Sequence, residues 1–484
     1  MRRYGVEHCA IIAPNVRGNS WLSRVCNALT DDGVPLSIST SDDVPLDEDI
    51  LRGKLAVATW HQFKGSERDC VIVFGIDNSY FKFMARDLPN DRCPNPAYVA
   101  LTRARKQLVV VQAKGNAAMP FVDWHAVQEY AEFKNLVDEE PTEEDSSGRT
   151  VKLGLMLPGM VSASEMARHV RDEELEDLVR ANTDIIEVAA PTPQNAFDAV
   201  PQKVKTNSKL QHYEAVADIN GLVITAALEL ALRGSLTTFG HQRSNRRAGL
   251  PEIPRNPRQR AMWLVRDAVR YEADVSGYKS RLSQMDKSQH VHQFGWLAAK
   301  DAKLLNLATQ WLQDEVLITT KDKTLLKFES SFCQPVNVDR ERTELRGQAD
   351  IMFEKIRGGV LRATIWEVKF VAALSMEHVA QAVAYAHMWL ETRLESQNGA
   401  PRPVFPRVVL LNVRTGEKWE IVTTAKRARK LIEGVLRAKY TAKGETTEME
   451  FLDDAGKVVK SVQMRLARHL EQRPAKRVQR INNT

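Results

Sequence analysis

The chain has 484 residues, of which 43% are hydrophobic and 27% are charged, with a formal net charge of +6. This length predicts two or three domains, each large enough to bury its own core. No apolar run reaches the roughly 18 residues of a membrane span and the N-terminus lacks a signal peptide, so we expect an intracellular protein, neither secreted nor bound to a membrane. The five cysteines are scattered without a CxxC spacing, which argues against a disulfide framework or a zinc knuckle.

Taken in chain order, the sequence predicts two α/β units. Short apolar runs alternate with helical stretches over residues 1–117, which is typical of a parallel sheet covered on both faces. Residues 118–205 are expected to form an acidic linker and a helical connector. A second α/β domain with a mixed central sheet is expected at 206–425, followed by a C-terminal helix and a basic tail at 426–484.

Polar side chains follow two apolar strands of the first unit, in VATWHQFKGSERDCVIVFGID (57–77) and NPAYVALTRARKQLVVV (95–111). Ligands bind at this edge of an open α/β sheet. Arg103 and Arg105 are expected at the start of a helix, where an arginine can stabilise charge that develops during phosphoryl transfer. The alternative is that both are surface arginines on a structural helix.

These two segments resemble motifs V and VI of UvrD/Rep-type superfamily 1 helicases, and HCAIIAPNVRGNSWLSRVCNALTDDGVPL resembles the start of their second RecA-like domain. The resemblance implies an arginine finger at Arg103, a nucleotide contact at Glu67, and contacts to single-stranded DNA from Thr59 and His61. The chain contains no GxxxxGK[ST] loop, which holds the nucleotide phosphates in such enzymes. We therefore expect ATP to bind only if a helicase N-terminal half supplies that loop in trans, and we expect neither ATP hydrolysis nor unwinding by this chain alone.

The stretch GQADIMFEKIRGGVLRATIWEVKF predicts two β-strands joined at Gly358-Gly359. Two glycines suit a two-residue hairpin turn because both positions can take positive φ. This register places Asp350 directly opposite Glu367, with Lys369 on the same face. Opposed carboxylates destabilise a sheet unless a cation lies between them. The alternative is a solvent-facing sheet surface with a simple Glu–Lys contact.

The next helix, HVAQAVAYAHMW, places Gln381 and Tyr385 on one face. The resulting D…ExK…QxxxY set resembles the RecB-like branch of the PD-(D/E)XK nucleases. Upstream, GLVITAALE resembles the Gly–His–Glu helix of that branch at Gly221 and Glu229, whereas Thr225 stands in the histidine position. The two resemblances together imply a RecA-like parallel sheet domain followed by a restriction-endonuclease-like α/β domain.

The nuclease resemblance implies a site for Mg²⁺ or Mn²⁺, because carboxylate and carbonyl oxygens suit these ions. The implied ligands are Asp350, Glu367, the backbone carbonyl of Val368, and Glu229. Lys369 would orient the attacking water or neutralise phosphate charge, while Gln381 and Tyr385 would position Lys369 or the DNA backbone. Cys333 is the only cysteine of this region, so no iron–sulfur cluster is expected.

The segment HQRSNRRAGLPEIPRNPRQR is basic and provides candidate DNA contacts at Arg243, Arg246 and Arg247. Nothing in the sequence resembles a base-reading module. We therefore expect a metal-dependent DNA nuclease, fused to a partial helicase module, that acts on single strands or strand ends. The alternative is a catalytically inactive DNA-binding scaffold that partners a helicase.

Overall fold

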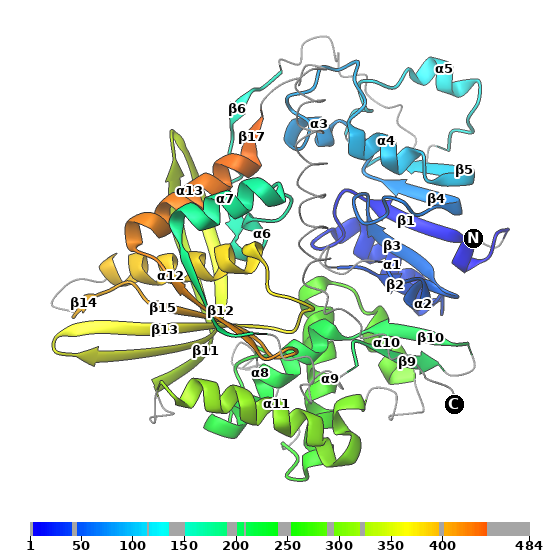
Figure 1. The fold of residues 1–484 in the computed structure, drawn as a ribbon. Coiled ribbons are helices and arrows are strands. Elements are labelled where there is room, and N and C mark those ends of the chain that lie inside the picture. Colours follow the sequence, from blue (N-terminus) through cyan, green and yellow to red (C-terminus); the bar gives the residue numbers. More distant parts are fainter. Residues whose placement is uncertain are drawn as a thin grey trace, which may run out of the picture.

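The chain folds around one parallel sheet and one larger mixed sheet, each with helices packed against it (Figure 1). The α/β class predicted from the sequence is therefore confirmed. The computed structural model describes residues 3–40, 46–113, 116–134, 151–190, 201–207, 210–240, 253–287, 295–319, 325–395 and 401–442.

The first sheet is parallel, with strand order β2-β3-β1-β4-β5. Its side chains alternate between two buried faces, so Ile11 packs with α1 while Ile12 packs in the core on the other face. Burial on both faces explains why the central strands, β1 and β3, are almost entirely apolar. The strands are β1 (Cys9–Ala13), β2 (Leu36–Ile38), β3 (Leu55–Thr59), β4 (Arg68–Phe74) and β5 (Ala104–Val111). The helices are η1 (Val6–His8), α1 (Ser20–Asp31), α2 (Glu48–Leu51), α3 (Ser79–Phe83), α4 (Asn95–Leu101) and α5 (Trp124–Gln128).

The second sheet is eight-stranded and mixed, with the order β11-β12-β13-β15-β16-β8, and with β7 beside β12 and β14 beside β13. β11, β12 and β13 form an antiparallel meander, and β15 then runs parallel to β13. The strands are β7 (Met160–Ser162), β8 (Asp184–Ala189), β11 (Leu326–Val338), β12 (Glu341–Arg357), β13 (Val360–Lys369), β14 (Arg402–Pro403), β15 (Arg407–Asn412) and β16 (Glu417–Val422).

Helices cover both faces of this sheet, so neighbouring residues of β13 enter different cores: Ile365 packs on the α12 side and Trp366 on the α8 side. One face carries α6 (Ala163–Met166), α7 (Asp172–Asn182), α12 (Met376–Glu395) and α13 (Ala425–Tyr440). The other carries α8 (Ala217–Arg233), α9 (Pro257–Ser276), η6 (Trp296–Ala298) and α11 (Ala299–Leu317). α8 and α9 both end at a glycine with left-handed φ, Gly234 and Gly277, which is the usual way to cap a helix C-terminus.

The second domain recruits more of the chain than the sequence predicted. β8 lies in the expected connector 118–205, yet it pairs with β16 and completes one end of the sheet. α6 and α7 of the same segment enter the core, as does α13 from the expected C-terminal part, 426–484. The predicted boundaries at 205 and 425 therefore do not separate structural units, because the sheet edge is completed by pairing between segments more than 200 residues apart.

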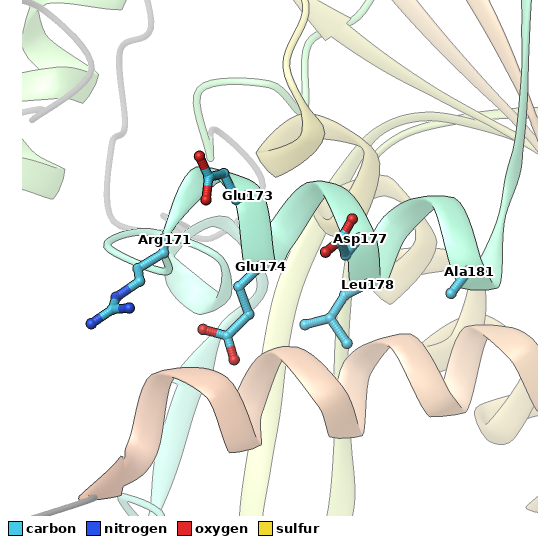
Figure 2. Close-up of a pocket in the computed structure, with 6 residues that line it drawn as sticks. All are labelled: Arg171, Glu173, Glu174, Asp177, Leu178 and Ala181. Carbon is cyan, nitrogen blue, oxygen red and sulfur yellow. The ribbon is translucent and has the colours of Figure 1, made fainter. Parts of the chain in front are cut away.

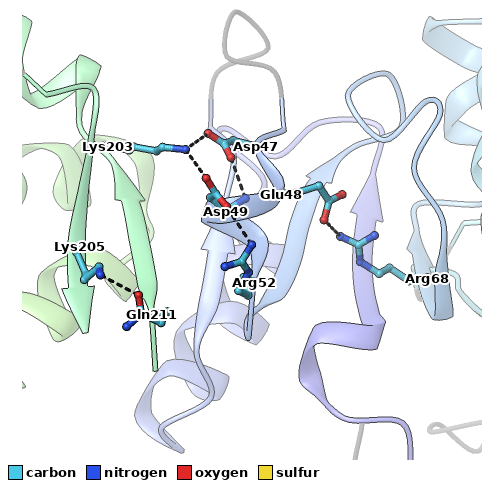
Figure 3. A network of polar contacts seen from close by, with 8 residues as sticks. All are labelled: Asp47, Glu48, Asp49, Arg52, Arg68, Lys203, Lys205 and Gln211. Atoms are coloured by element: carbon cyan, nitrogen blue, oxygen red, sulfur yellow. Dashed lines mark hydrogen bonds and ion pairs between the residues drawn. The ribbon is translucent and has the colours of Figure 1, made fainter. Parts of the chain in front are cut away.

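Two short antiparallel ribbons and one helix lie between the domains. They are β9 (Lys203–Asn207) with β10 (His212–Ala215), β6 (Gly154–Leu155) with β17 (Thr441–Ala442), and α10 (Ser280–Lys287). Lys203 Nζ of β9 lies 3.0 Å from Asp47 Oδ2 and 2.7 Å from Asp49 Oδ2, beside α2 (Figure 3). Beneath this exposed network, Lys54 and Glu214 form an ion pair in which the lysine side chain is fully buried.

A second contact joins the turn between α9 and α10 to the first domain. Tyr278 Oη donates to the carbonyl of Val16 at 2.7 Å, and the Tyr278 ring is buried in the core on the α1 side. Asn27 of α1 binds both sides of the same turn, through Gly277 O at 2.9 Å and Lys279 N at 3.0 Å. The two domains thus share buried surface as well as exposed ion pairs.

Candidate active site

The hairpin that carries the candidate site has the predicted register. Gly358 and Gly359 occupy its turn with φ of 57° and 74°, a region that glycine adopts without a steric penalty. The antiparallel ladder runs without a bulge from the turn to the pair Ile351 and Trp366. The predicted two-residue turn is therefore confirmed, and Asp350 and Glu367 are the next residues beyond this ladder.

The two strands change their partners where the acidic side chains begin. Val368 donates its N–H to Asp350 Oδ2 at 2.7 Å, so a side-chain oxygen satisfies this strand N–H. β13 continues to Lys369 alongside β15. Met352 packs in the α12-side core, and Asp350, two residues away, faces the same side. The aspartate therefore lies on the α12 face of the sheet.

Glu367 lies beside Lys369 on this face and is only 2% exposed. Its Oε1 is 2.8 Å from Lys369 Nζ. Its Oε2 is buried and has no hydrogen-bond partner within the described part of the chain. A buried carboxylate oxygen without a donor is costly, and a bound cation would satisfy it.

Helix α12 holds the ammonium of Lys369 from the other side. Lys369 Nζ donates to Gln381 Oε1 at 2.8 Å, and Gln381 Nε2 donates to Tyr385 Oη at 2.7 Å. Gln381 and Tyr385 are one helical turn apart, as their spacing predicted. The structure thus connects Tyr385, Gln381, Lys369 and Glu367 through successive polar contacts.

Tyr385 fits against β12 because residue 347 is a glycine. A Cβ atom on Gly347 would lie 2.3 Å from Tyr385 Cε1, which is too close for two carbon atoms, and 3.1 Å from Ala163 Cβ, which is a tight contact. α6 begins at Ala163, so this helix, β12 and α12 meet at the tyrosine ring. The small residue three positions before Asp350 therefore sets how closely α12 approaches the site.

A further carboxylate faces the site from β11, and the sequence pattern gave no indication of it. Glu329 and Asp350 lie between two paired positions of the β11–β12 ladder, Phe328 with Ile351 and Ser330 with Ala349. Its φ of 50° is left-handed, which is uncommon for a residue with a side chain and recurs at functional sites. Gln348 Nε2 donates to Glu329 Oε2 at 2.6 Å. The stretch KFESSF reads as an ordinary alternating strand, so only the backbone conformation distinguishes this glutamate.

Burial and mutual repulsion raise the pKa values of these acids. Burial first, and then the charge of Glu367, raises the pKa of Asp350 to about 8. Burial, followed by Asp350 and Glu367, raises the pKa of Glu329 to about 9. Burial also raises the pKa of Glu367, while Lys369 opposes that rise. Without a cation, the neutral forms of these acids are therefore favoured, because Lys369 alone does not compensate three carboxylates. A bound divalent cation would lower their pKa values and favour the ionised forms.

The oxygen atoms of Asp350, Glu367 and the Val368 carbonyl suit a hard cation that has few protein ligands. The described residues include no group of three or more His, Cys, Asp or Glu side chains arranged to hold a metal ion. A cation would therefore rest on Asp350 and Glu367, with the Val368 carbonyl next to them. Mg²⁺ is compatible with such a sparse set because it keeps several of its water ligands.

Glu229 is fully buried, and its carboxylate accepts hydrogen bonds from neighbouring groups. The N–H and hydroxyl groups of Thr237 and Thr238 donate to its two oxygens at 2.5–3.0 Å. These bonds tie the loop after α8 to the helix and leave the oxygens little capacity for a metal, in contrast to the ligand role expected from the sequence. Thr225, at the histidine position, donates its hydroxyl to Gly221 O at 3.1 Å, within its own helix.

The predicted single-strand contacts lie at the carboxyl end of β3. Thr59 is buried, and its Oγ1 accepts a hydrogen bond from Gln62 N at 3.1 Å. His61 is exposed, and its ring stacks on that of His169 in the second domain, with centroids 5.1 Å apart and an interplanar angle of 28°. Of the two, only His61 presents its side chain at the surface.

The predicted nucleotide contacts lie at the neighbouring strands. Glu67 is exposed and directly precedes β4, and Arg103 lies in the turn between α4 and β5, where its Nε donates to Val99 O at 2.9 Å. Arg105 is in β5 and is 2.9 Å from Asp69 Oδ1. The expected helix start at these arginines is wrong, because α4 ends before them and the chain then enters the parallel sheet.

The remaining expectations concern other parts of the surface. Arg243, Arg246 and Arg247 lie outside the described residues. Cys333 is a free, exposed thiol in β11, and the four other cysteines are free thiols of the first domain. Within the described ranges, no helix is both long and apolar enough to cross a membrane.

A groove runs along α7 (Figure 2). It is lined by Arg171, Glu173, Glu174, Asp177, Leu178 and Ala181. Carboxylates outnumber the guanidinium, so this groove would repel a polyanion. It therefore does not extend the candidate site toward nucleic acid.

Comparison with known proteins identifies one segment. A family profile described as the UvrD-like helicase C-terminal domain matches residues 54–111, which include β3 to β5. No curated protein matches the chain. The C-terminal domain of a possible DNA helicase from Lactobacillus plantarun WCFS1 is similar, with 20% identity over 23% of this chain and 58% of that chain and a TM-score of 0.17. SSO0001 is similar with 16% identity over 45% of this chain and 85% of that chain and a TM-score of 0.19.

Proposed function

We propose that this chain is a metal-dependent DNA nuclease attached to a UvrD-like helicase C-terminal domain. The observation that carries the proposal is the buried Oε2 of Glu367, which has no donor within the described part of the chain and lies next to a fixed ammonium. Asp350 would share the cation with Glu367. Solvent-facing sheet residues with a simple ion pair would need neither this burial nor the link from Lys369 to α12.

The chemistry divides between the ion and the side chains. Bound Mg²⁺ or Mn²⁺ would lower the pKa of a ligated water and stabilise charge on a phosphoryl oxygen. Lys369 would place a positive charge beside the scissile phosphate, where electrostatic stabilisation contributes most to phosphoryl transfer. Gln381 would keep the ammonium directed into the site, and Tyr385 would fix Gln381.

The helicase-like domain would contribute contacts to a single strand, with affinity that falls steeply with salt. Without a phosphate-binding loop, we expect the purified chain to show no DNA-stimulated ATPase activity. Glu67 and Arg103 would act on ATP only when a partner chain supplies that loop. ATP hydrolysis by the chain alone would contradict this part of the proposal.

Cleavage of labelled single-stranded DNA with Mg²⁺, Mn²⁺ or EDTA tests the proposal. Asp350→Ala and Lys369→Ala should abolish cleavage, whereas Lys355→Ala, an exposed lysine of β12, should not. Mn²⁺ binding followed by electron paramagnetic resonance should be lost in Asp350→Ala and kept in Lys369→Ala. Metal-independent DNA binding without cleavage in the wild type would favour the rival function, a non-catalytic scaffold.

A further inference from the structure

The two domains meet at a pair of exposed aromatic rings. His61 follows the carboxyl end of β3, and His169 follows α6 in the second domain. Their centroids are 5.1 Å apart with an interplanar angle of 28°, so the rings are stacked. Both residues are exposed. The pair therefore presents flat aromatic surface at the junction of the domains.

The position of this pair links two sites. The carboxyl edge of a parallel sheet is where such domains bind ligands, and His61 lies on that edge. On the other side, α6 leads from His169 back to Ala163, which packs beside Gly347 and the Tyr385 ring. Tyr385 in turn accepts a hydrogen bond from Gln381, which accepts one from Lys369. One short helix thus separates the stacked rings from the carboxylate site.

His169 is also held in an unusual conformation. Its φ is 65°, in the left-handed region that residues with side chains seldom adopt. A purely structural surface position would be served as well by glycine, which takes this conformation without strain. Such backbone conformations recur at functional sites, and in the exposed turns of this chain Gln211 and Asp339 adopt the same conformation.

We propose that the stacked rings of His61 and His169 form a base-stacking subsite for single-stranded nucleic acid, placed between the helicase-like edge and the carboxylate site. The ligand class rests on the proposed function. A nucleobase offers a π face of any sequence, and aromatic side chains bind single strands by stacking on such faces. Duplex DNA, whose bases are already stacked, would not use the subsite.

The test measures binding in EDTA, so that cleavage does not interfere. The probe is a twelve-nucleotide oligothymidylate with one central 2-aminopurine, whose fluorescence is quenched by stacking. His61→Ala and His169→Asn should weaken binding by about 5- to 100-fold and reduce quenching, a range typical of losing one aromatic platform. Asparagine tolerates left-handed φ, so His169→Asn removes the ring with little change in backbone conformation. His169→Phe should restore binding, and His8→Ala, at an exposed histidine before β1, should bind like the wild type.

Several outcomes decide the matter. Unchanged affinity in His169→Asn, or a loss in His169→Phe equal to that in His169→Asn, would overturn the subsite, as would an equal loss for duplex DNA. Circular dichroism and thermal midpoints establish that each variant is folded. Failure of the nuclease proposal gives a different pattern, in which Mg²⁺ produces no cleavage while the binding losses in EDTA remain.

Discussion

Lys369 Nζ and Gln381 Oε1 are 2.8 Å apart, and this hydrogen bond joins the end of β13 to the first turns of α12. The amide of Gln381 also donates to Tyr385 Oη, so its orientation is fixed from both sides. The ammonium of Lys369 is therefore held between this amide and Glu367. Position, and not only charge, is what α12 contributes to the candidate site.

Replacement of Gln381 by alanine should lower metal-dependent cleavage by about 10- to 100-fold, because a misplaced group loses much of its effect on the transition state. The fold should persist, since alanine is a good helix former. Single-turnover rates at saturating Mg²⁺ measure the effect. If Gln381→Ala cleaves at the wild-type rate while Lys369→Ala is inactive, Gln381 does not position the lysine.

Gly347→Ala should displace Tyr385 without touching any charged group. The new methyl would lie 2.3 Å from the tyrosine ring, and overpacking of this kind costs about 1–3 kcal/mol. Chemical denaturation measures that cost, and the cleavage assay should show a parallel loss of rate. Gly358→Ala in the hairpin turn is a useful control, because it strains a left-handed position where the added Cβ would meet no atom within 4 Å. It should lower stability and leave the rate per folded molecule unchanged.

The raised pKa of Asp350 predicts how stability depends on pH in EDTA. The folded protein holds this proton up to a pKa of about 8, whereas the ordinary value is 3.8. Stability from this group is therefore complete below about pH 4 and is lost as the pH rises to about 8, by up to about 1.4 kcal/mol per pH unit. Asp350→Asn keeps an acceptor for the Val368 N–H and should be more stable than the wild type at pH 9.

Thermal midpoints of both proteins between pH 5 and pH 9 measure this effect, with the exposed Asp177→Asn as a control. Addition of Mg²⁺ at pH 8 should raise the midpoint of the wild type and leave that of Asp350→Asn unchanged. Parallel pH profiles of the two proteins would mean that Asp350 ionises normally.

The buried pair of Lys54 and Glu214 should respond asymmetrically to substitution. Lys54→Met leaves a buried carboxylate without its cation and should destabilise the protein by about 3–5 kcal/mol. The double variant Lys54→Met/Glu214→Leu removes both charges and should recover most of that loss. Denaturant titrations of the single and double variants measure the coupling. A double variant as unstable as Lys54→Met would contradict the expected recovery.

Local pattern sufficed to predict the parts of the site that lie close together in the sequence. The Gly358-Gly359 turn, the register that brings Asp350 next to Glu367, and the spacing of Gln381 and Tyr385 all follow from short-range geometry. The parallel first sheet followed from the alternation of apolar strands with helical stretches.

Other features depend on long-range pairing or on conformation that composition does not encode. β8 pairs with a strand more than 200 residues away, so its segment could be read only as a connector. Glu329 acquires its place from a left-handed φ, and neither neighbour along the chain indicates it. Glu229 was expected to be a metal ligand only from a resemblance in sequence, yet Thr237 and Thr238 bind its oxygens, which depends on how the loop after α8 folds back.

Arg86 donates to the carbonyls of Lys152, Gly154 and Tyr440, and its own carbonyl accepts from Lys152 N. The segment that begins at residue 151 is thus hydrogen-bonded to the first domain through Lys152 and Gly154. Covalent continuity through residues 135–150 is consequently not what keeps the halves together. Residues 1–134 and 151–484, co-expressed as two separate chains, should therefore still co-purify.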